Sequence, residues 1–208
     1  MGIAERKERE KAIRREQIMN AASELFMSRG FGATTMEEVA KRAELSPALI
    51  YRHFKNKEDL YASLNLSSLQ RLNQTLRSIK SDPDITVEEK LMKVKDELYN
   101  HFQRNQLLVR NVLHIQLEDT LTEISKENLN RLNRAGKNTQ STISEIFMQG
   151  VKEGKFKKRN AVAISDIVWA VFTGLVVWEE AKRKISPEKD FLKSTLDTAF
   201  EILCKGFM

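Results

Sequence analysis

Residues 35–54, TMEEVAKRAELSPALIYRHF, decide the fold, because they contain two helix-start signals close together in the chain. Thr35 followed by Glu38 forms a capping box, in which each side chain bonds a backbone N–H group at the start of a helix. Ser46 followed by Pro47 marks a second start, since serine caps well and proline is tolerated at the first helical position. These signals predict two short helices, over residues 36–43 and 47–54, joined by a three-residue turn.

Two short helices joined by such a turn form a helix-turn-helix unit, whose second helix enters the major groove of DNA. In the second helix, Ile50 and Phe54 are four residues apart and share the buried face. Ala48 and Arg52 fall on the opposite face, where a small side chain allows close approach and a guanidinium reaches a guanine edge or a phosphate. The other candidates suit a thymine methyl group or phosphate oxygens: Leu49, Tyr51, His53, Lys55 and Lys57.

The rest of the chain is also predicted to be helical. A helix over residues 9–29 precedes the motif and ends at Gly30, a residue typical of helix C-termini. With three prolines, eight glycines and no strand-like alternation, the chain is predicted to be all-α. We expect a three-helix DNA-binding domain in residues 1–60 and a larger helical effector-binding and dimerisation domain in residues 61–208. Its expected helices cover residues 57–80, 86–104, 106–117, 122–154, 160–184 and 187–207.

Composition adds bounds on the compartment and the partner. The net charge of +6 and the pI of about 9.4 favour an anionic partner, although the excess is modest for 208 residues. The single cysteine, Cys204, excludes an internal disulfide and fits the cytoplasm, and the charged N-terminus does not have the form of a secretory signal. Residues 161–178 are mostly apolar but contain Asp166, so we expect a buried core or interface helix and no membrane span.

Residues 18–64 resemble the DNA-binding domain of the tetracycline-repressor (TetR) family. The resemblance implies a homodimer that binds a double-stranded DNA operator and releases it when a small apolar or amphipathic effector binds, most simply as a repressor. One departure stands in the turn, where the family usually has glycine and this chain has Glu44, at a cost of about 1 kcal/mol for a left-handed backbone. With the resemblance, the candidate DNA-binding residues are Thr35, Ser46, Pro47, Ala48, Leu49, Tyr51, Arg52, His53, Lys55 and Lys57.

The candidate effector-binding residues lie on the apolar stripes of the long helices, because ligand pockets are mainly apolar with a few polar groups. Most residues on such stripes belong to a core, and only part of them would line a pocket. The candidates are Tyr99, His101, Phe102, Asn111, His114, Ile115, Phe147, Trp169 and Phe172. His101 and His114 do not have the spacing of a zinc site, so no metal is expected.

Two further readings stay open. The sequence lacks the usual catalytic motifs and any cofactor motif, which argues against an enzyme that carries an accessory DNA module. A DNA-binding adaptor whose C-terminal domain binds another protein also remains possible.

The basic residues before residue 16 alternate with glutamates, so they form either a solvated helix face or an arm that contacts the DNA backbone: Arg6, Lys7, Arg9, Lys11, Arg14 and Arg15.

Overall fold

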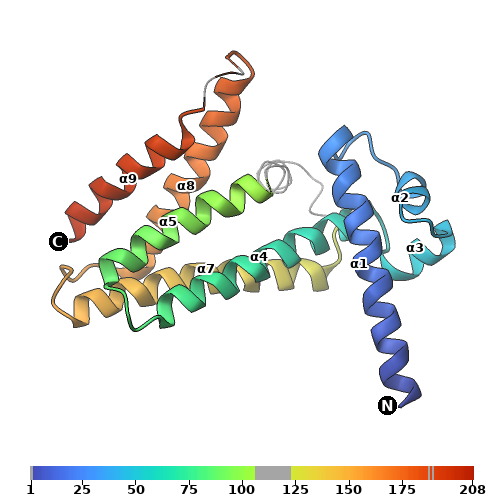
Figure 1. Cartoon of the computed structure of the whole chain (residues 1–208), viewed down its shortest axis with the longest axis horizontal. Coiled ribbons are helices and arrows are strands. Elements are labelled where there is room, and N and C mark those ends of the chain that lie inside the picture. The colour runs from blue at the N-terminus through green and yellow to red at the C-terminus, as the bar shows by residue number, and fades with distance from the viewer. Residues whose placement is uncertain (1, 106–122, 187, 189) are drawn as a thin grey trace. The chain divides into compact units, whose positions relative to one another are not determined.

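The computed structural model describes residues 2–105, 123–186, 188 and 190–208. Within these residues the chain forms eight α-helices and no strand, which confirms the all-α prediction (Figure 1). The predicted helix over residues 106–117 lies outside the described residues. The observed helices are α1 (Ile3–Arg29), α2 (Met36–Arg42), α3 (Pro47–His53), α4 (Lys57–Ser81), α5 (Val87–Arg104), α7 (Lys126–Lys152), α8 (Ala161–Arg183) and α9 (Leu192–Phe207).

Most helix ends agree with the predicted ones, but α1 is longer at its start. It begins at Ile3, six residues before the predicted position. The added residues are mainly Glu, Arg and Lys, which are good helix formers, and Arg6 pairs with Glu10 one turn later at 2.8 Å. Helix α9 is shorter than predicted, because it begins at Leu192.

The chain divides into two compact units. The N-terminal unit takes in residues 2–67 and, of the later part of the chain, the described residues 123–132. The C-terminal unit takes in residues 68–105 and the described residues from 133 onward. The N-terminal unit therefore includes the start of α7, far along the chain from the helix-turn-helix, while the predicted boundary at residue 60 stays a prediction.

One apolar core holds α1, α2, α3 and the start of α4 together in the N-terminal unit. Ile18, Ile50 and Leu60 have no exposed surface, and burial of such side chains contributes about 1.5–3 kcal/mol each. An aromatic cluster lies beside them, with the ring of Phe31 5.3 Å from that of Phe26 and 5.0 Å from that of Tyr61. This core fixes the angle between α2 and α3.

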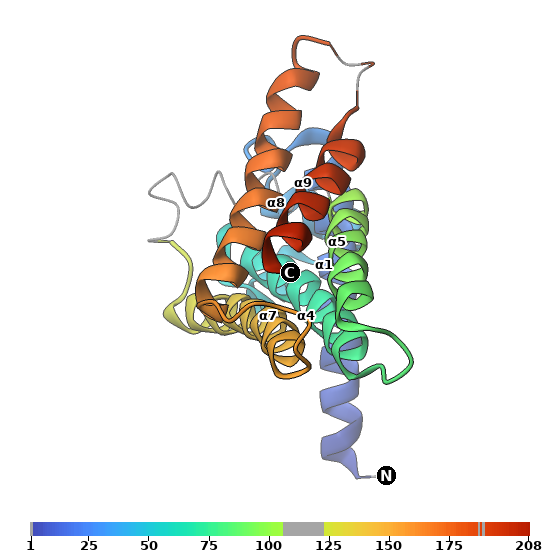
Figure 2. The same ribbon diagram turned by 90° about the vertical axis from the view of Figure 1, so that its left-hand side faces the viewer.

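In the C-terminal unit, α9 packs against both α5 and α8 (Figure 2). An ion pair joins the buried Lys95 of α5 to the half-buried Asp197 of α9. At the far end of α7, the ring of Phe156 stacks on Phe147 at 5.6 Å and both contact Phe207. Gly150 makes room for this cluster, since a Cβ atom there would lie 2.1 Å from the Phe156 ring.

Helix α8 is the one described helix that is long and apolar enough to cross a membrane by length and composition. Only 28% of its most apolar window is buried within the chain. Val168, Phe172 and Val176 face the core, whereas Ile167, Val177 and Trp178 are exposed. The helix therefore has two apolar faces, and packing among the described residues covers one of them.

Candidate nucleic-acid interface

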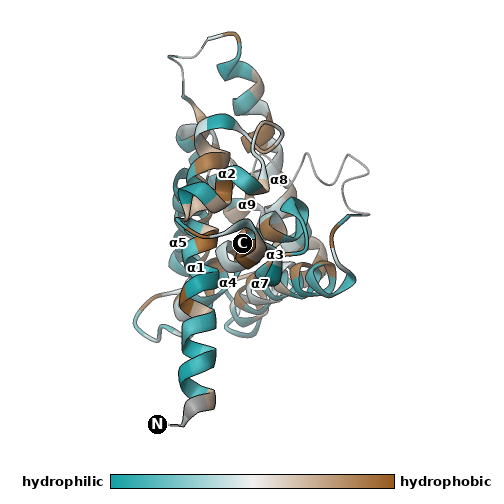
Figure 3. Ribbon diagram, turned by 90° about the vertical axis from the view of Figure 1, so that its right-hand side faces the viewer, coloured by the Kyte–Doolittle hydropathy of each residue, from teal (hydrophilic) through white to brown (hydrophobic). Residues whose placement is uncertain are grey.

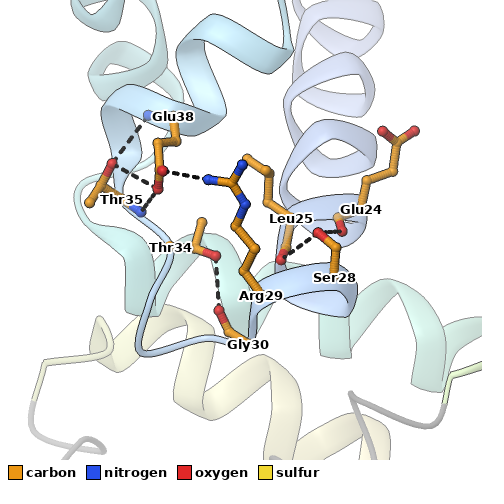
Figure 4. A network of polar contacts seen from close by, with 8 residues as sticks. All are labelled: Glu24, Leu25, Ser28, Arg29, Gly30, Thr34, Thr35 and Glu38. Atoms are coloured by element: carbon orange, nitrogen blue, oxygen red, sulfur yellow. Dashed lines mark hydrogen bonds and ion pairs between the residues drawn. The ribbon is translucent and has the colours of Figure 1, made fainter.

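The connection from α1 to α2 is fixed by a network of polar contacts (Figure 4). The Thr35 hydroxyl accepts from the backbone N–H of Glu38 at 3.2 Å, and the Glu38 carboxylate accepts from the backbone N–H of Thr35 at 2.9 Å. The predicted capping box is thus confirmed. Arg29 pairs with the same carboxylate at 2.8 Å, and Thr34 donates to the carbonyl of Gly30 at 2.9 Å. The hydrogen bond from the Thr35 backbone, helped by the Thr35 hydroxyl and Arg29, holds the pKa of Glu38 below its usual value.

The turn between α2 and α3 contains the strained residue that the sequence indicated. Glu44 has a φ of 55°, the one positive φ outside glycine in the described part of the chain. The backbone N–H of Leu45 donates to the carbonyl of Ala40 at 3.0 Å and closes the turn. The Ser46 hydroxyl then accepts from the backbone N–H of Leu49 at 3.3 Å and caps α3, as predicted.

Helix α3 presents its predicted outer face to solvent. Ile50 and Phe54 are buried, whereas Ala48 and Arg52 are exposed, as the helical period indicated. Of the ten candidates, Leu49, His53 and Lys57 are half-buried, and seven are exposed: Thr35, Ser46, Pro47, Ala48, Tyr51, Arg52 and Lys55. Their contact with DNA stays a prediction, but the exposed surface is small at Ala48, cationic at Arg52 and aromatic at Tyr51.

Two of the candidates already have partners inside the unit. The Tyr51 hydroxyl donates to the Glu37 carboxylate at 3.3 Å, and partial desolvation together with that carboxylate raises the pKa of Tyr51. The Lys57 ammonium donates to the carbonyl of Phe31 at 3.0 Å and lies 4.5 Å from the centre of its ring. Lys57 therefore joins α4 to the segment before α2, while two of its three N–H groups remain for other acceptors.

Arg15 is a residue whose position sequence reasoning missed. It was grouped with the basic N-terminal residues, yet it is half-buried and packs its guanidinium 4.3 Å from the centre of the Phe54 ring. It donates to the carbonyl of His53 at 3.3 Å and to the Ser63 hydroxyl at 2.7 Å. Arg15 thereby joins α1 to the end of α3 and to α4.

The comparisons with known proteins agree with this geometry. The model of the family described as bacterial regulatory proteins, tetR family, matches residues 18–64. The transcriptional activator FasR of Mycolicibacterium smegmatis is 47% identical over 58 residues, which are 28% of this chain and only 25% of FasR. The fatty acid metabolism regulator protein of Bacillus subtilis is 27% identical over 144 residues, 68% of this chain and 70% of that protein.

A solved structure extends the likeness along the chain. The transcriptional regulator FadR from Bacillus subtilis, in complex with stearoyl-CoA, superposes with a TM-score of 0.70 at 22% identity, over 93% of this chain and 99% of FadR. The match over residues 18–64 identifies them as the helix-turn-helix DNA-binding domain of a TetR-family transcriptional regulator. The likeness to FadR extends the TetR-family fold along the rest of the chain.

In this TetR-family protein, the start of α7 is held by the start of α4. The Asp59 carboxylate, 5% exposed, accepts from the Ser125 backbone N–H at 2.8 Å and from the Asn128 amide at 3.1 Å. The Asn56 amide donates to the carbonyl of Glu123 at 2.9 Å. Burial raises the pKa of Asp59, but the bonds from Ser125 and Asn128 outweigh it and hold that pKa below the usual 3.8.

We expect Asp59→Ala to lower the free energy of unfolding by about 2 kcal/mol, because it removes two hydrogen bonds to a charged acceptor. The pKa of the folded state is depressed, so this stabilisation is present above the unfolded pKa and is lost as the pH falls through the folded pKa. Urea unfolding at pH 7 and pH 3 measures both effects. Glu58→Ala is the control, since Glu58 lies in the same first turn of α4. Equal losses for the two variants at pH 7 would contradict the assignment.

The effector-binding candidates that are described lie in the C-terminal unit. Phe102, Phe147 and Phe172 are fully buried, and His101 is buried with its Nε2 atom 3.3 Å from the Ser68 hydroxyl. Tyr99 and Trp169 are half-buried, with the Trp169 ring 5.9 Å from that of Phe172. Asn111, His114 and Ile115 lie outside the described residues. These residues supply a largely apolar interior, and their contact with an effector stays a prediction.

Proposed function

We propose that this regulator is a repressor that binds a palindromic operator as a homodimer and releases it when a fatty acyl compound binds the C-terminal unit. The observation that carries the proposal is the exposed face of α3, fixed at both ends by caps and by Arg15. Occupying an operator is enough to repress, whereas activation also needs a surface for the transcription machinery. Such a protein acts in the cytoplasm and has no catalytic role.

The exposed face of α8 supports the homodimer. Small and apolar side chains follow this face at helical spacing: Ala163, Ile167, Ala170, Gly174, Val177 and Ala181. Five other apolar residues of α8 and α9 are buried inside the chain and are not available to a partner: Ile164, Val168, Leu192, Leu196 and Phe200. A second copy that covers the exposed face in a two-fold arrangement would form a closed, isologous interface.

Both the comparisons and the interior support a fatty acyl effector. Two of the similar proteins are named for fatty acid regulation or solved with stearoyl-CoA, and the candidate residues Phe102, Phe147 and Phe172 are buried apolar side chains. A hundredfold loss of operator affinity needs about 2.7 kcal/mol of coupling between the two sites. A buried acyl chain gains about 0.8 kcal/mol per CH₂ group, so a fraction of its binding energy is sufficient.

The test begins with selection of binding sites from random duplex DNA, followed by fluorescence anisotropy on the selected operator. We expect a palindrome with half-sites about 34–36 Å apart or a multiple of this, and a hundredfold weaker affinity with stearoyl-CoA but not with free coenzyme A. Arg52→Ala should change the selected bases. Binding of stearoyl-CoA without any change in operator affinity contradicts the release mechanism. DNA affinity that responds only to a protein partner would favour the adaptor reading instead.

A further inference from the structure

The first three turns of α1 extend beyond the core of the N-terminal unit. The first buried residue of α1 is Ile18, and every residue from Ala4 to Arg14 is exposed. In Figure 3 these turns project past α2 and α3 and are hydrophilic almost throughout. Residues 3–14 span about 18 Å at 1.5 Å per residue, so the projecting part is long enough to reach a separate surface.

The projecting part has one basic face. Lys7, Lys11 and Arg14 are spaced four and three residues apart, so they lie on a single face of the helix. The same face continues through Ile18 and Ala22, which are fully buried against the rest of the unit. The face is therefore apolar where the unit covers it and basic where it continues beyond the unit.

The acidic residues of α1 are placed so that they do not neutralise this face. Glu5 and Glu16 lie on the opposite side by the helical period, and Glu10, at the edge, pairs with Arg6 at 2.8 Å. Glu8 lies on the other edge. The side with Glu5 and Glu16 also carries Arg9, whereas no glutamate lies on the face of Lys7, Lys11 and Arg14.

The basic face is continuous with the candidate DNA-binding surface. Arg15, one turn after Lys11, contacts the carbonyl of His53 at the end of α3. Burial, with the positive charges of Arg15, Arg52 and Lys11, lowers the pKa of His53 at the same end of α3. Lys55 is exposed just beyond it.

We propose that the face formed by Lys7, Lys11 and Arg14 binds the phosphate backbone of the duplex that flanks the half-site contacted by α3. This inference rests on the proposed operator binding and adds a second contact area to it. We assign duplex DNA to this face because the phosphates of DNA are negative and the face is positive, and because the face adjoins the candidate DNA-binding surface. Phosphate contacts carry no sequence information, so this face contributes affinity and register, while the choice of bases stays with α3.

The test compares wild type with the triple variant K7A/K11A/R14A, using full-length protein and the selected operator with about one helical turn of flanking DNA. Each lost phosphate contact lowers the slope of log K against log salt by about 1. For two subunits we expect the slope to fall by about 2 or more, and the affinity at about 100 mM salt to fall at least tenfold. The selected base sequence should not change.

Two controls make the result specific. Arg9→Ala removes an exposed positive charge from the opposite side of α1 and should leave the slope unchanged. Trimming the flanking DNA should abolish the difference between the triple variant and wild type. An unchanged slope for K7A/K11A/R14A on the long operator overturns this inference alone. Failure of wild type to bind any selected duplex would instead overturn the proposed function.

Discussion

Acidification from pH 6.5 to pH 4 is expected to cost the folded protein about 3 kcal/mol through His101 alone. His101 is 7% exposed, and burial, with the positive charges of Arg104 and Arg71, lowers its pKa from 6.5 to about 4. In the unfolded chain His101 therefore takes up a proton as the pH falls below 6.5, whereas in the folded chain it takes up that proton only near pH 4. Because the unfolded state binds more protons within this window, stability falls with falling pH there and levels off below it.

The comparison of wild type with His101→Gln isolates this effect, since glutamine retains a polar group for the Ser68 hydroxyl but does not titrate. Free energies of unfolding from urea titrations at pH 7, 5.5 and 4 should show wild type losing about 3 kcal/mol more than the variant. His53→Gln serves as the control, because His53 is only half-buried and should contribute less. Parallel pH profiles for wild type and His101→Gln would show that His101 is not the group responsible.

The features that the sequence predicted well are set by residues close together in the chain. The capping box uses residues three apart, Thr35 and Glu38, and Ser46 caps α3 through Leu49. The outer face of α3 follows from the 3.6-residue period, which places Ala48 and Arg52 opposite Ile50. Such local signals identify the helix-turn-helix and most of its exposed surface without knowledge of the rest of the fold.

The features that the sequence did not predict depend on contacts between residues far apart in the chain. Arg15 bonds the carbonyl of His53, 38 residues away, and Asp59 bonds Ser125, 66 residues away. No local pattern distinguishes Arg15 from the exposed basic residues before it, or Asp59 from an acid that merely stabilises a helix start. Lys57 is similar, because its bond to the carbonyl of Phe31 depends on the packed core.

Helix α8 shows a different kind of ambiguity. It is apolar on most of its circumference, so its periodicity does not say which face the chain itself buries. Ile164 and Val168 face the core, whereas Ile167, one residue before Val168, is 43% exposed. The sequence therefore predicted a helix with interface character, and the packing of α9 against α8 helps to decide which side remains exposed.

Substitution of Gly174 by arginine is expected to convert the proposed homodimer into monomers. Gly174 is exposed near the middle of the small and apolar face of α8, and a Cβ atom there would meet nothing within 4 Å among the residues that the structure describes. The monomer therefore tolerates the side chain, and replacing glycine inside a helix favours folding by up to about 1 kcal/mol. Across a two-fold interface, each subunit would bury one unpaired guanidinium against its partner, a cost of several kcal/mol.

Light scattering should give about twice 24.0 kDa for wild type and about 24.0 kDa for Gly174→Arg, which should remain helical by circular dichroism. Operator affinity should fall by at least about a hundredfold. In a dimer, binding of one N-terminal unit raises the effective concentration of the other at its half-site, and separate monomers lose this advantage. Gly136→Arg is the matched control: Gly136 is also helical, lies on α7 and leaves equal room for a side chain, so this variant should remain a dimer with wild-type affinity. A Gly174→Arg protein that stays dimeric would place the two-fold contact elsewhere than on α8. A wild type that is monomeric at micromolar concentration would remove that contact altogether. In either case, a dimer formed through α8 would not explain recognition of a palindrome.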